Sequence, residues 1–307
     1  MGTQRPYPAR EPPATGQEVR LEAGSLIGAE QRHDPPLGAY GIRLRGVDEA
    51  SHLLVPVSAD APSYELMTEP GPAAAPEEHV DDGRARLWLP RGGQILIDRE
   101  AGQVRFRLPE PLRADEIVHP YLAPAAAVIA RWAGRESIHS GAFAGRHGVW
   151  GLVARREGGK SSTLAWLARA GADILCDDML VLDGRTPLAG PRTVDLREDA
   201  AARLGAGEDI GLTGARERWR VALCPAAAPA PLAGWVFLTW GEPFELRRLG
   251  GAELLNRLAG ERALRPPPVR PEAFLELLEM PAWELRRPLG WGSLPETADR
   301  LLELADG

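Results

Sequence analysis

Apolar and polar residues alternate along the first third of the chain. A period of two is typical of strands that bury one face of a sheet. Five such runs, separated by turns such as Gly92-Gly93, predict a small antiparallel sheet: Gly41–Leu44, Leu53–Val57, Arg84–Leu89, Gln94–Ile97 and Val104–Leu108. The polar stretch 69–83 predicts a loop. Residues 1–37 are rich in Pro, Gly and charge without a period, so we expect a disordered or loosely tethered lead-in there.

A helical period replaces the alternation at residue 121. Apolar residues recur at helical spacing from Tyr121 to Arg135, and this helix is predicted to end near Gly134. The segment 183–220 is turn-rich. Beyond it the pattern predicts a buried strand and two helices, at 231–240, 251–260 and 271–279.

A strand, a loop, a helix and a second strand are predicted between residues 149 and 182. The apolar run 149–153 is suited to a buried strand, and 161–170 carries apolar residues on one helical face, closed by Gly171 as a left-handed cap. The second strand, 174–182, is interrupted by two acids. This order predicts an α/β fold class. We expect a β-rich N-terminal domain at 38–120 and a core at 121–307 that ends in helices.

Lys160 is the single lysine among the 36 basic residues. It stands in Gly158-Gly159-Lys160-Ser161-Ser162, between the predicted strand and helix. In phosphate-binding loops (P-loops) backbone N–H groups form an anion nest, the lysine reaches the β- and γ-phosphates, and the next hydroxyl ligates Mg²⁺. ATP and Mg²⁺ are therefore the expected cofactors; the expected contacts are Ala154, Arg155, Arg156, Glu157, Gly158, Gly159, Lys160, Ser161 and Ser162. The alternative is a surface lysine that follows two glycines by chance.

Asp177 and Asp178 are adjacent acids within an apolar strand pattern. Such a pair is costly to bury unless it meets a cation or a proton. Strand alternation points the two side chains to opposite faces, so at least one is expected to face the bound phosphates, where it could hold Mg²⁺ or deprotonate a hydroxyl. The alternative is a solvated strand end.

Histidine and arginine supply the remaining candidates. His139 precedes the loop strand, although an isolated histidine is more often a core or surface residue. Arg216, Arg218 and Arg220 alternate with other residues, so on a strand they would share one face and could contact phosphate or an acidic substrate. A solvated basic edge is an equally good interpretation.

Composition narrows the functional classes. The chain has 307 residues and a net charge of −7, which argues against nucleic acid and anionic membranes as partners and favours a peptide or small-molecule partner. Two cysteines, no apolar signal core at the start and no apolar stretch long enough to span a bilayer predict a cytoplasmic protein. The oligomeric state, a homo-oligomer included, stays open.

Three motifs resemble those of the HPr kinase/phosphorylase superfamily in order and spacing. They are Ile138-His139-Ser140-Gly141-Ala142, the loop Arg156-Glu157-Gly158-Gly159-Lys160-Ser161-Ser162, and Cys176-Asp177-Asp178-Met179. The whole layout looks most like the HPr-kinase-like proteins found with lasso-peptide and related peptide-tailoring systems. The resemblance covers about residues 120–185 and is only architectural elsewhere. It implies a P-loop kinase core of the HPr kinase/PEP carboxykinase type.

The resemblance also implies roles for single residues. His139 would be an active-site histidine and Lys160 would bind phosphate. Ser161 would ligate Mg²⁺, and Asp178 would accept the substrate proton with Asp177 beside it on the metal side.

Two loop positions depart from the family pattern. Ala154 stands where the family loop opens with glycine, and Glu157 replaces a further loop glycine. Alanine and glutamate resist the positive φ that glycine permits, and a carboxylate in an anion nest is expected to oppose a triphosphate. The downstream glutamate motif of the family is not recognisable; the nearest candidates are Asp195, Arg197 and Glu198.

The leading hypothesis is an ATP-dependent kinase for a serine-type hydroxyl on a peptide or small protein. By the resemblance, the acceptor would be a lasso-type precursor peptide. A second hypothesis is a nucleotide- or peptide-binding module whose altered loop has lost turnover. A third is an HPr-type protein kinase or a small-molecule kinase on the same core.

Overall fold

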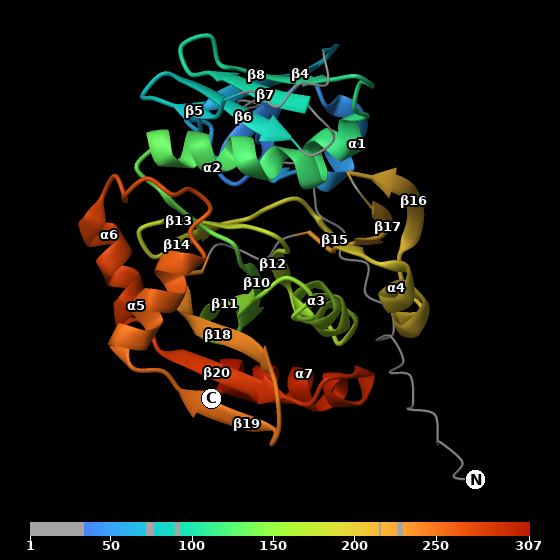
Figure 1. The fold of residues 1–307 in the computed structure, drawn as a ribbon, viewed down its shortest axis with the longest axis vertical. Helices are drawn as coiled ribbons and strands as arrows, with labels where there is room; N and C mark the ends of the chain where they lie inside the picture. Colours follow the sequence, from blue (N-terminus) through green and yellow to red (C-terminus); the bar gives the residue numbers. More distant parts are fainter. Residues whose placement is uncertain (1–33, 72–76, 90–92, 215, 226–229) are drawn as a thin grey trace, which may run out of the picture. The chain divides into compact units, whose positions relative to one another are not determined.

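The computed structural model describes residues 34–71, 77–89, 93–214, 216–225 and 230–307 (Figure 1). Nearly all of the predicted lead-in, at 1–33, lies outside the described residues. Residues Pro35–Gly307 form one compact unit. The domain boundary expected near residue 120 stays a prediction.

The first sheet has eight strands among the described residues, in the order β3-β1-β2-β4-β8-β7-β6-β5. Their bounds are β1 Leu37–Ala39, β2 Ile42–Arg45, β3 Val55–Pro56, β4 Ser63–Pro70, β5 His79–Val80, β6 Arg84–Leu89, β7 Gly93–Asp98 and β8 Gln103–Leu108. The sheet is mixed, because β4 runs parallel to both β2 and β8. The small antiparallel sheet expected from the sequence is therefore wrong in its pairing. Strand β4, whose fully buried side chains are Tyr64 and Leu66, offers too short an alternation to be recognised.

One helix covers the inner face of this sheet. Helix α2 (Leu122–Trp132) follows the short α1 (Ala114–Glu116) and a wide turn at Ile117–Tyr121. Its apolar face packs into one core with side chains of the sheet such as Ile95 and Phe106. The helix predicted from 121 to 135 is confirmed with slightly shorter bounds.

The second sheet has the order β12-β10-β11-β18-β20-β19. Its strands are β10 Gly141–Gly145, β11 Gly148–Ala154, β12 Ile174–Cys176, β18 Leu232–Trp240, β19 Glu245–Arg248 and β20 Ala282–Arg287. Strands β11, β18 and β20 run parallel at its centre, and the outer pairs are antiparallel. The strands predicted at 149–153 and 231–240 are confirmed as the middle of this sheet.

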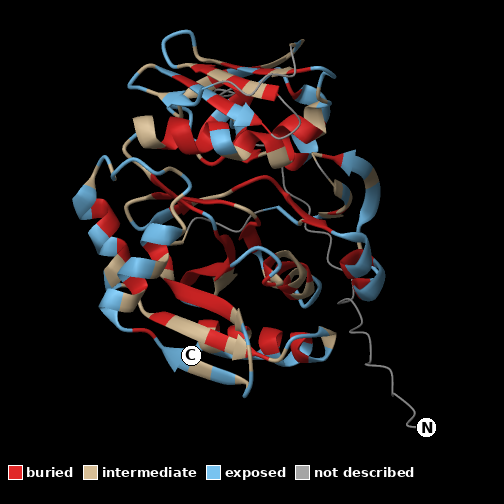
Figure 2. Cartoon of the chain, in the orientation of Figure 1, coloured by how far each residue is buried: buried red, intermediate tan, exposed pale blue. Residues whose placement is uncertain are grey.

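Helices cover both faces of the second sheet, so its central strands are buried on both sides (Figure 2). On β11, Trp150 and Leu152 pack with helices α3 (Lys160–Arg169) and α7 (Leu294–Asp306). Val149 and Val153 point to the other face and pack with α5 (Gly251–Gly260) and α6 (Pro271–Glu276). The predicted helices at 161–170, 251–260 and 271–279 are confirmed, and α7 is an addition to them.

The turn-rich interpretation of residues 183–220 is wrong. Two three-stranded sheets use this segment, in the orders β14-β13-β9 and β15-β17-β16. The elements are β9 Glu136–Ile138, β13 Leu180–Asp183, β14 Thr186–Leu188, β15 Thr193–Leu196, α4 Glu198–Leu204, β16 Glu208–Thr213 and β17 Arg216–Ala222. Charged residues inside β15 and β17, such as Asp195 and Arg220, are buried by pairing with each other, which hides the strand pattern.

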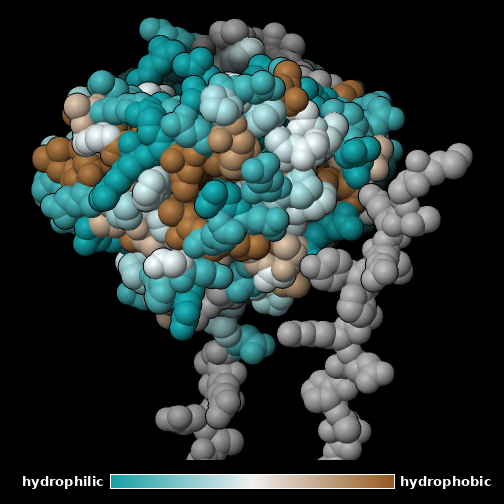
Figure 3. All heavy atoms as spheres, turned by 90° about the horizontal axis from the view of Figure 1, so that it is seen from below, coloured by the Kyte–Doolittle hydropathy of each residue, from teal (hydrophilic) through white to brown (hydrophobic). Residues whose placement is uncertain are grey.

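Within the described residues, no helix combines the length and the apolar character that crossing a bilayer requires. Seen from below, the surface is mainly hydrophilic, with separate groups of hydrophobic side chains (Figure 3). Exposed apolar side chains include Leu255, Leu275 and Leu289. Scattered residues of this kind are normal on a folded protein.

Candidate active site

The predicted phosphate loop connects β11 to α3. Strand β11 ends at Ala154, the chain turns over 155–159, and α3 begins at Lys160. Gly159 has a φ of 78°, in the left-handed region that glycine adopts at little cost. A Cβ atom at this position would lie 2.6 Å from Nη2 of Arg287. The backbone angle therefore favours glycine at 159, and a larger residue would also displace the guanidinium end of Arg287.

The two departures from the family loop have different structural consequences. Ala154 is the buried last residue of β11 and does not have a positive φ, so the expected conflict at this position is absent. Glu157 does adopt a left-handed φ of 66°. Its carboxylate, however, is exposed and accepts a hydrogen bond of 2.9 Å from Nη2 of Arg197, which lowers its pKa. The expected backbone strain is confirmed, and the negative charge is partly neutralised outside the loop.

Lys160 lies buried at the first turn of α3. Its Nζ is 3.9 Å from Oδ1 of Asp178 and has no hydrogen-bond partner among the residues that the structure describes. Ser161 follows, and its Oγ donates a 2.9 Å hydrogen bond to Oδ1 of Asp177. The loop and the acid pair, 16 residues apart in the chain, thus meet in space.

Asp177 and Asp178 form the bend between β12 and β13, two strands that belong to different sheets. They are not successive residues of one continuous strand, so the expectation that they point to opposite faces is wrong. Ligand atoms of both carboxylates and of His119 lie within 4.8 Å of one another. Both acids therefore face the same small region beside the loop.

The two carboxyl groups have opposite pKa shifts. Burial, followed by repulsion from Asp178, raises the pKa of Asp177 to about 8. Burial also opposes ionisation of Asp178, yet attraction by Lys160 and His119, among other groups, lowers its pKa overall. At neutral pH one carboxyl of the pair is thus ionised and the other readily holds a proton or meets a cation.

His119 is the functional candidate that the sequence analysis missed. It is buried with 3% of its surface exposed, and its Nε2 lies 3.8 Å from Oδ2 of Asp178 and 3.7 Å from Oδ2 of Asp195. It precedes Pro120 within an apolar run, where it resembles an ordinary core residue. A lone polar residue in such a run is a weak signal, and only the fold brings it to the acid pair.

His139 lies at the margin of the site. Its side chain is half exposed, and its Nδ1 is 3.7 Å from Oε2 of Glu261. It helps to lower the pKa of Asp178, but less than Lys160, His119 and Arg218 do. The structure therefore brings His139 near the acid pair, while His119 makes the closer approach.

The three candidate arginines occupy β17 as the alternation required, but in different surroundings. Arg220 is buried and donates to Asp195 and Asp115, each at 3.0 Å. Arg218 lies 3.9 Å from Oδ2 of Asp195. Arg216 lines a hollow of about 410 Å³ beside the loop, together with Glu157, Arg197, Glu198, Glu217 and Trp219. Arg220 thus links Asp195 to Asp115, and Arg216 has the more open position.

Arg287 and Trp240 support the loop from the second sheet. Nη2 of Arg287 donates a 2.9 Å hydrogen bond to the carbonyl of Gly158, and the guanidinium lies 4.2 Å from the ring centroid of Trp240. Nε1 of Trp240 donates to the carbonyl of Glu157 at 3.1 Å. Arg287 has no carboxylate partner within the described part of the chain, and burial lowers its pKa to about 10. It is a buried cation placed against the loop.

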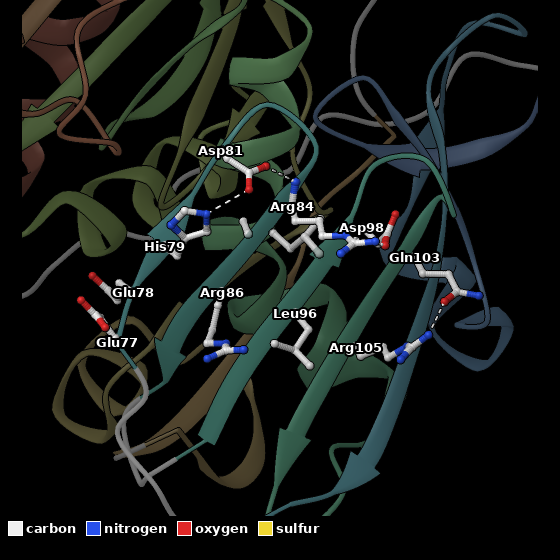
Figure 4. Close-up of a pocket in the computed structure, with 12 residues that line it drawn as sticks. Glu77, Glu78, His79, Asp81, Arg84, Arg86, Leu96, Asp98, Gln103 and Arg105 are labelled. Atoms are coloured by element: carbon white, nitrogen blue, oxygen red, sulfur yellow. Dashed lines mark hydrogen bonds and ion pairs between the residues drawn. The ribbon is translucent and has the colours of Figure 1, made fainter.

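A separate hollow of about 650 Å³ lies on the first sheet (Figure 4). Its lining mixes both charges with the strand residues of β5 to β8, and includes His79, Asp81, Arg84 and Arg105. None of the loop residues or of the paired acids lines it. It carries no grouping of nucleophile and base that would make it a competing active site.

Comparisons with known proteins add little to this geometry. No family model matches the chain, and no curated protein matches it. Among solved structures, the Hpr(Ser) kinase/phosphatase from Coxiella burnetii is similar with a TM-score of 0.28 and 13% identity, over 55% of this chain and 97% of that chain. A likeness at this level supports no conclusion about activity.

Proposed function

We propose that this protein is an ATP-dependent kinase that phosphorylates a serine-type hydroxyl on a peptide or small protein. The observation that carries the proposal is the position of Lys160. It is the chain's single lysine, it begins the helix after a strand and a glycine turn, and its buried Nζ has only Asp178 nearby as an ionic partner among the described residues. A buried ammonium without hydrogen bonds is costly unless an anion completes its surroundings.

The loop residues suit the binding of a triphosphate. Backbone N–H groups at the start of α3 point away from the helix body, where they attract negatively charged oxygens. Lys160 would add a compact positive charge at the β- and γ-phosphates. Arg287 holds the Gly158 carbonyl from the other side, which keeps the turn in place. Catalysis would then consist of positioning and charge neutralisation.

Ser161 and Asp177 fit the role of Mg²⁺ ligands. The hydroxyl and the carboxyl are already 2.9 Å apart, and burial next to Asp178 raises the pKa of Asp177 to about 8, so a nearby cation would favour its ionised form. Bound Mg²⁺ would neutralise charge on the phosphates. Asp178 is about one-third exposed, its pKa is lowered, and it could accept the proton of the acceptor hydroxyl.

Titration of the protein with ATP and Mg²⁺ tests the loop assignment. Lys160→Met should lose at least tenfold in affinity, since one charge-assisted contact is worth about 1.5–3 kcal/mol. Arg146→Met, in the exposed turn between β10 and β11, is the matched control. Equal binding by wild type and Lys160→Met, or no binding by wild type at millimolar ATP, would refute the loop assignment.

A binding module without turnover is the second candidate. The observation that favours it is the left-handed backbone of Glu157, a strained conformation in the loop that must hold the phosphates. Incubation with labelled ATP and a panel of acceptors separates the two candidates. Serine-containing peptides, a small HPr-type protein and small-molecule alcohols test the acceptor class, with a lasso-type precursor peptide as the first choice. ATP binding without transfer to any acceptor would favour the module.

A further inference from the structure

Nε2 of His119 faces the acid pair without a hydrogen bond to any described residue. This nitrogen is buried. The nearest carboxylate oxygens, at 3.7 Å on Asp195 and 3.8 Å on Asp178, are beyond hydrogen-bond distance. A buried nitrogen that has lost its hydrogen bonds to water and forms none in the protein destabilises the folded state by about 1–3 kcal/mol. An ion bound between the nitrogen and the carboxylates would offset this destabilisation.

The spacing of the three groups suits a single metal ion. One ligand atom each from His119, Asp177 and Asp178 lies within 4.8 Å of the other two. Metal–nitrogen and metal–oxygen bonds are roughly 2.0–2.2 Å long, so two ligands of one ion are separated by up to about 4.4 Å. Small side-chain movements would bring all three atoms to one ion.

The surroundings leave His119 free to act as a ligand. Asp195, the other nearby acid, is already held by Arg220 and approached by Arg218. In the tautomer that carries its proton on Nδ1, the ring offers the lone pair of the unpartnered Nε2 to an ion. Among the described residues, Lys160 is the one fixed cation within ion-pair distance of the acid pair Asp177 and Asp178. Two carboxyl groups beside one fixed cation can accept further positive charge.

We infer that His119, Asp177 and Asp178 form a binding site for a first-row transition-metal dication such as Mn²⁺, in preference to Mg²⁺. The inference deepens the proposed function, on which it rests for the presence of a metal at the acid pair. Mg²⁺ prefers oxygen ligands throughout, whereas an imidazole nitrogen suits transition metals. Because His119 comes from the turn before α2, the site joins the first sheet's helix to the loop core.

Pulsed electron paramagnetic resonance of Mn²⁺ bound to the full-length, nucleotide-free protein tests the site. Protein containing ¹⁵N-histidine should show a change in the nitrogen modulation of the Mn²⁺ echo relative to unlabelled protein. Mg²⁺ should displace Mn²⁺ only at roughly tenfold or higher excess. Absence of histidine-nitrogen modulation in the wild type, or displacement by equimolar Mg²⁺, would overturn the inference even if no variant folds.

Three histidine variants assign the ligand. His119→Gln should lose the modulation and weaken Mn²⁺ binding roughly tenfold or more. His147→Gln, in the exposed turn between β10 and β11, is the matched control and should keep both properties. Loss of the modulation in His139→Gln, with His119→Gln unchanged, would contradict the assignment.

The experiment separates this inference from the kinase proposal, because it uses neither ATP nor an acceptor. Mn²⁺ bound through His119 in a protein that transfers no phosphoryl group would support the inference and refute the proposed function. Phosphoryl transfer with Mg²⁺, together with no histidine-nitrogen modulation of the Mn²⁺ echo, would support the proposed function and refute the inference.

Discussion

Asp178 is ionised at neutral pH and partly exposed, so it can accept a proton at the mouth of the site. Attraction by nearby positive charges, that of Lys160 above all, outweighs the effect of burial on the pKa of Asp178. Asp177, one residue earlier, is buried and accepts a hydrogen bond from Ser161. Asp177 would thus serve the metal alone, whereas Asp178, a metal ligand through one oxygen, would keep its other oxygen for the proton.

Replacement of Asp178 by asparagine should abolish most phosphoryl transfer while ATP binding remains. The amide has nearly the same shape but cannot accept the proton, and general base catalysis is worth about two to four orders of magnitude. Turnover and ATP affinity are measured on the same preparation. Asp173→Asn, an exposed position just before β12, is the control. Turnover near the wild-type rate in Asp178→Asn would show that Asp178 is not the general base.

Glu157→Gly should stabilise the protein by about 1 kcal/mol, because glycine adopts the left-handed angle without a Cβ penalty. Its ATP affinity should rise only a few-fold, since Arg197 already neutralises the glutamate. Glu157→Ala separates the two effects, because it removes the charge and keeps the strain. Thermal unfolding and ATP titration give both values. If alanine raised the affinity as much as glycine, the carboxylate itself would be what opposes the triphosphate.

At the scale of elements, β18 and β20 set the position of the loop. Their ends supply Trp240 and Arg287, which hold two successive loop carbonyls, at Glu157 and Gly158. The parallel pairing of β11, β18 and β20 is what places these three strand ends at one edge. The edge at the carboxyl ends of parallel strands is the usual place for a ligand in an α/β sheet.

Arg287→Met should lower ATP affinity by roughly tenfold, the value of one charge-assisted hydrogen bond to the loop. The free energy of unfolding should fall little or even rise, because a buried cation without a carboxylate partner stabilises the fold weakly. Arg286→Met is the matched control: it is the neighbour on β20 and pairs with Glu245 instead. Equal affinity losses in both variants would show that the effect comes from β20 as a whole.

For the whole molecule, the first sheet and the core with the loop share a boundary at helix α2. Ile117, Leu122 and Ile129 lie in one core with the interior of the first sheet. His119 lies in the same turn and reaches Asp178 of the loop core. The first sheet therefore contributes to the site through the element that it packs against.

A fragment of residues 121–307 should consequently fail to unfold cooperatively, because the apolar face of α2 would lose its cover and His119 would be absent. A fragment of residues 35–307, the compact unit, is the control and should unfold in one transition. Circular dichroism during heating measures both. A cooperative transition in the shorter fragment would support an independent domain that begins at 121.

Features that depend on consecutive residues could be predicted from the sequence. The strand at 149–153, the glycine turn, the helix after Lys160 and its cap at Gly171 depend on local period and backbone freedom, and the structure has them where the pattern predicts. The acid pair was visible for the same reason, as two charges that interrupt an apolar run. Its geometry was not, because a bend between two sheets has no local signature that separates it from a strand.

Which distant residues meet at the loop depends on how the elements pack in three dimensions. His119, Asp195 and Arg287 belong to segments that precede or follow the loop by many residues, and each resembles an ordinary core or strand residue in its own segment. Burial of a charge or an imidazole is acceptable only when partners from other segments compensate for lost water. Those partners are chosen by the packing of two sheets around α2 and α3, a property that no short stretch of sequence contains.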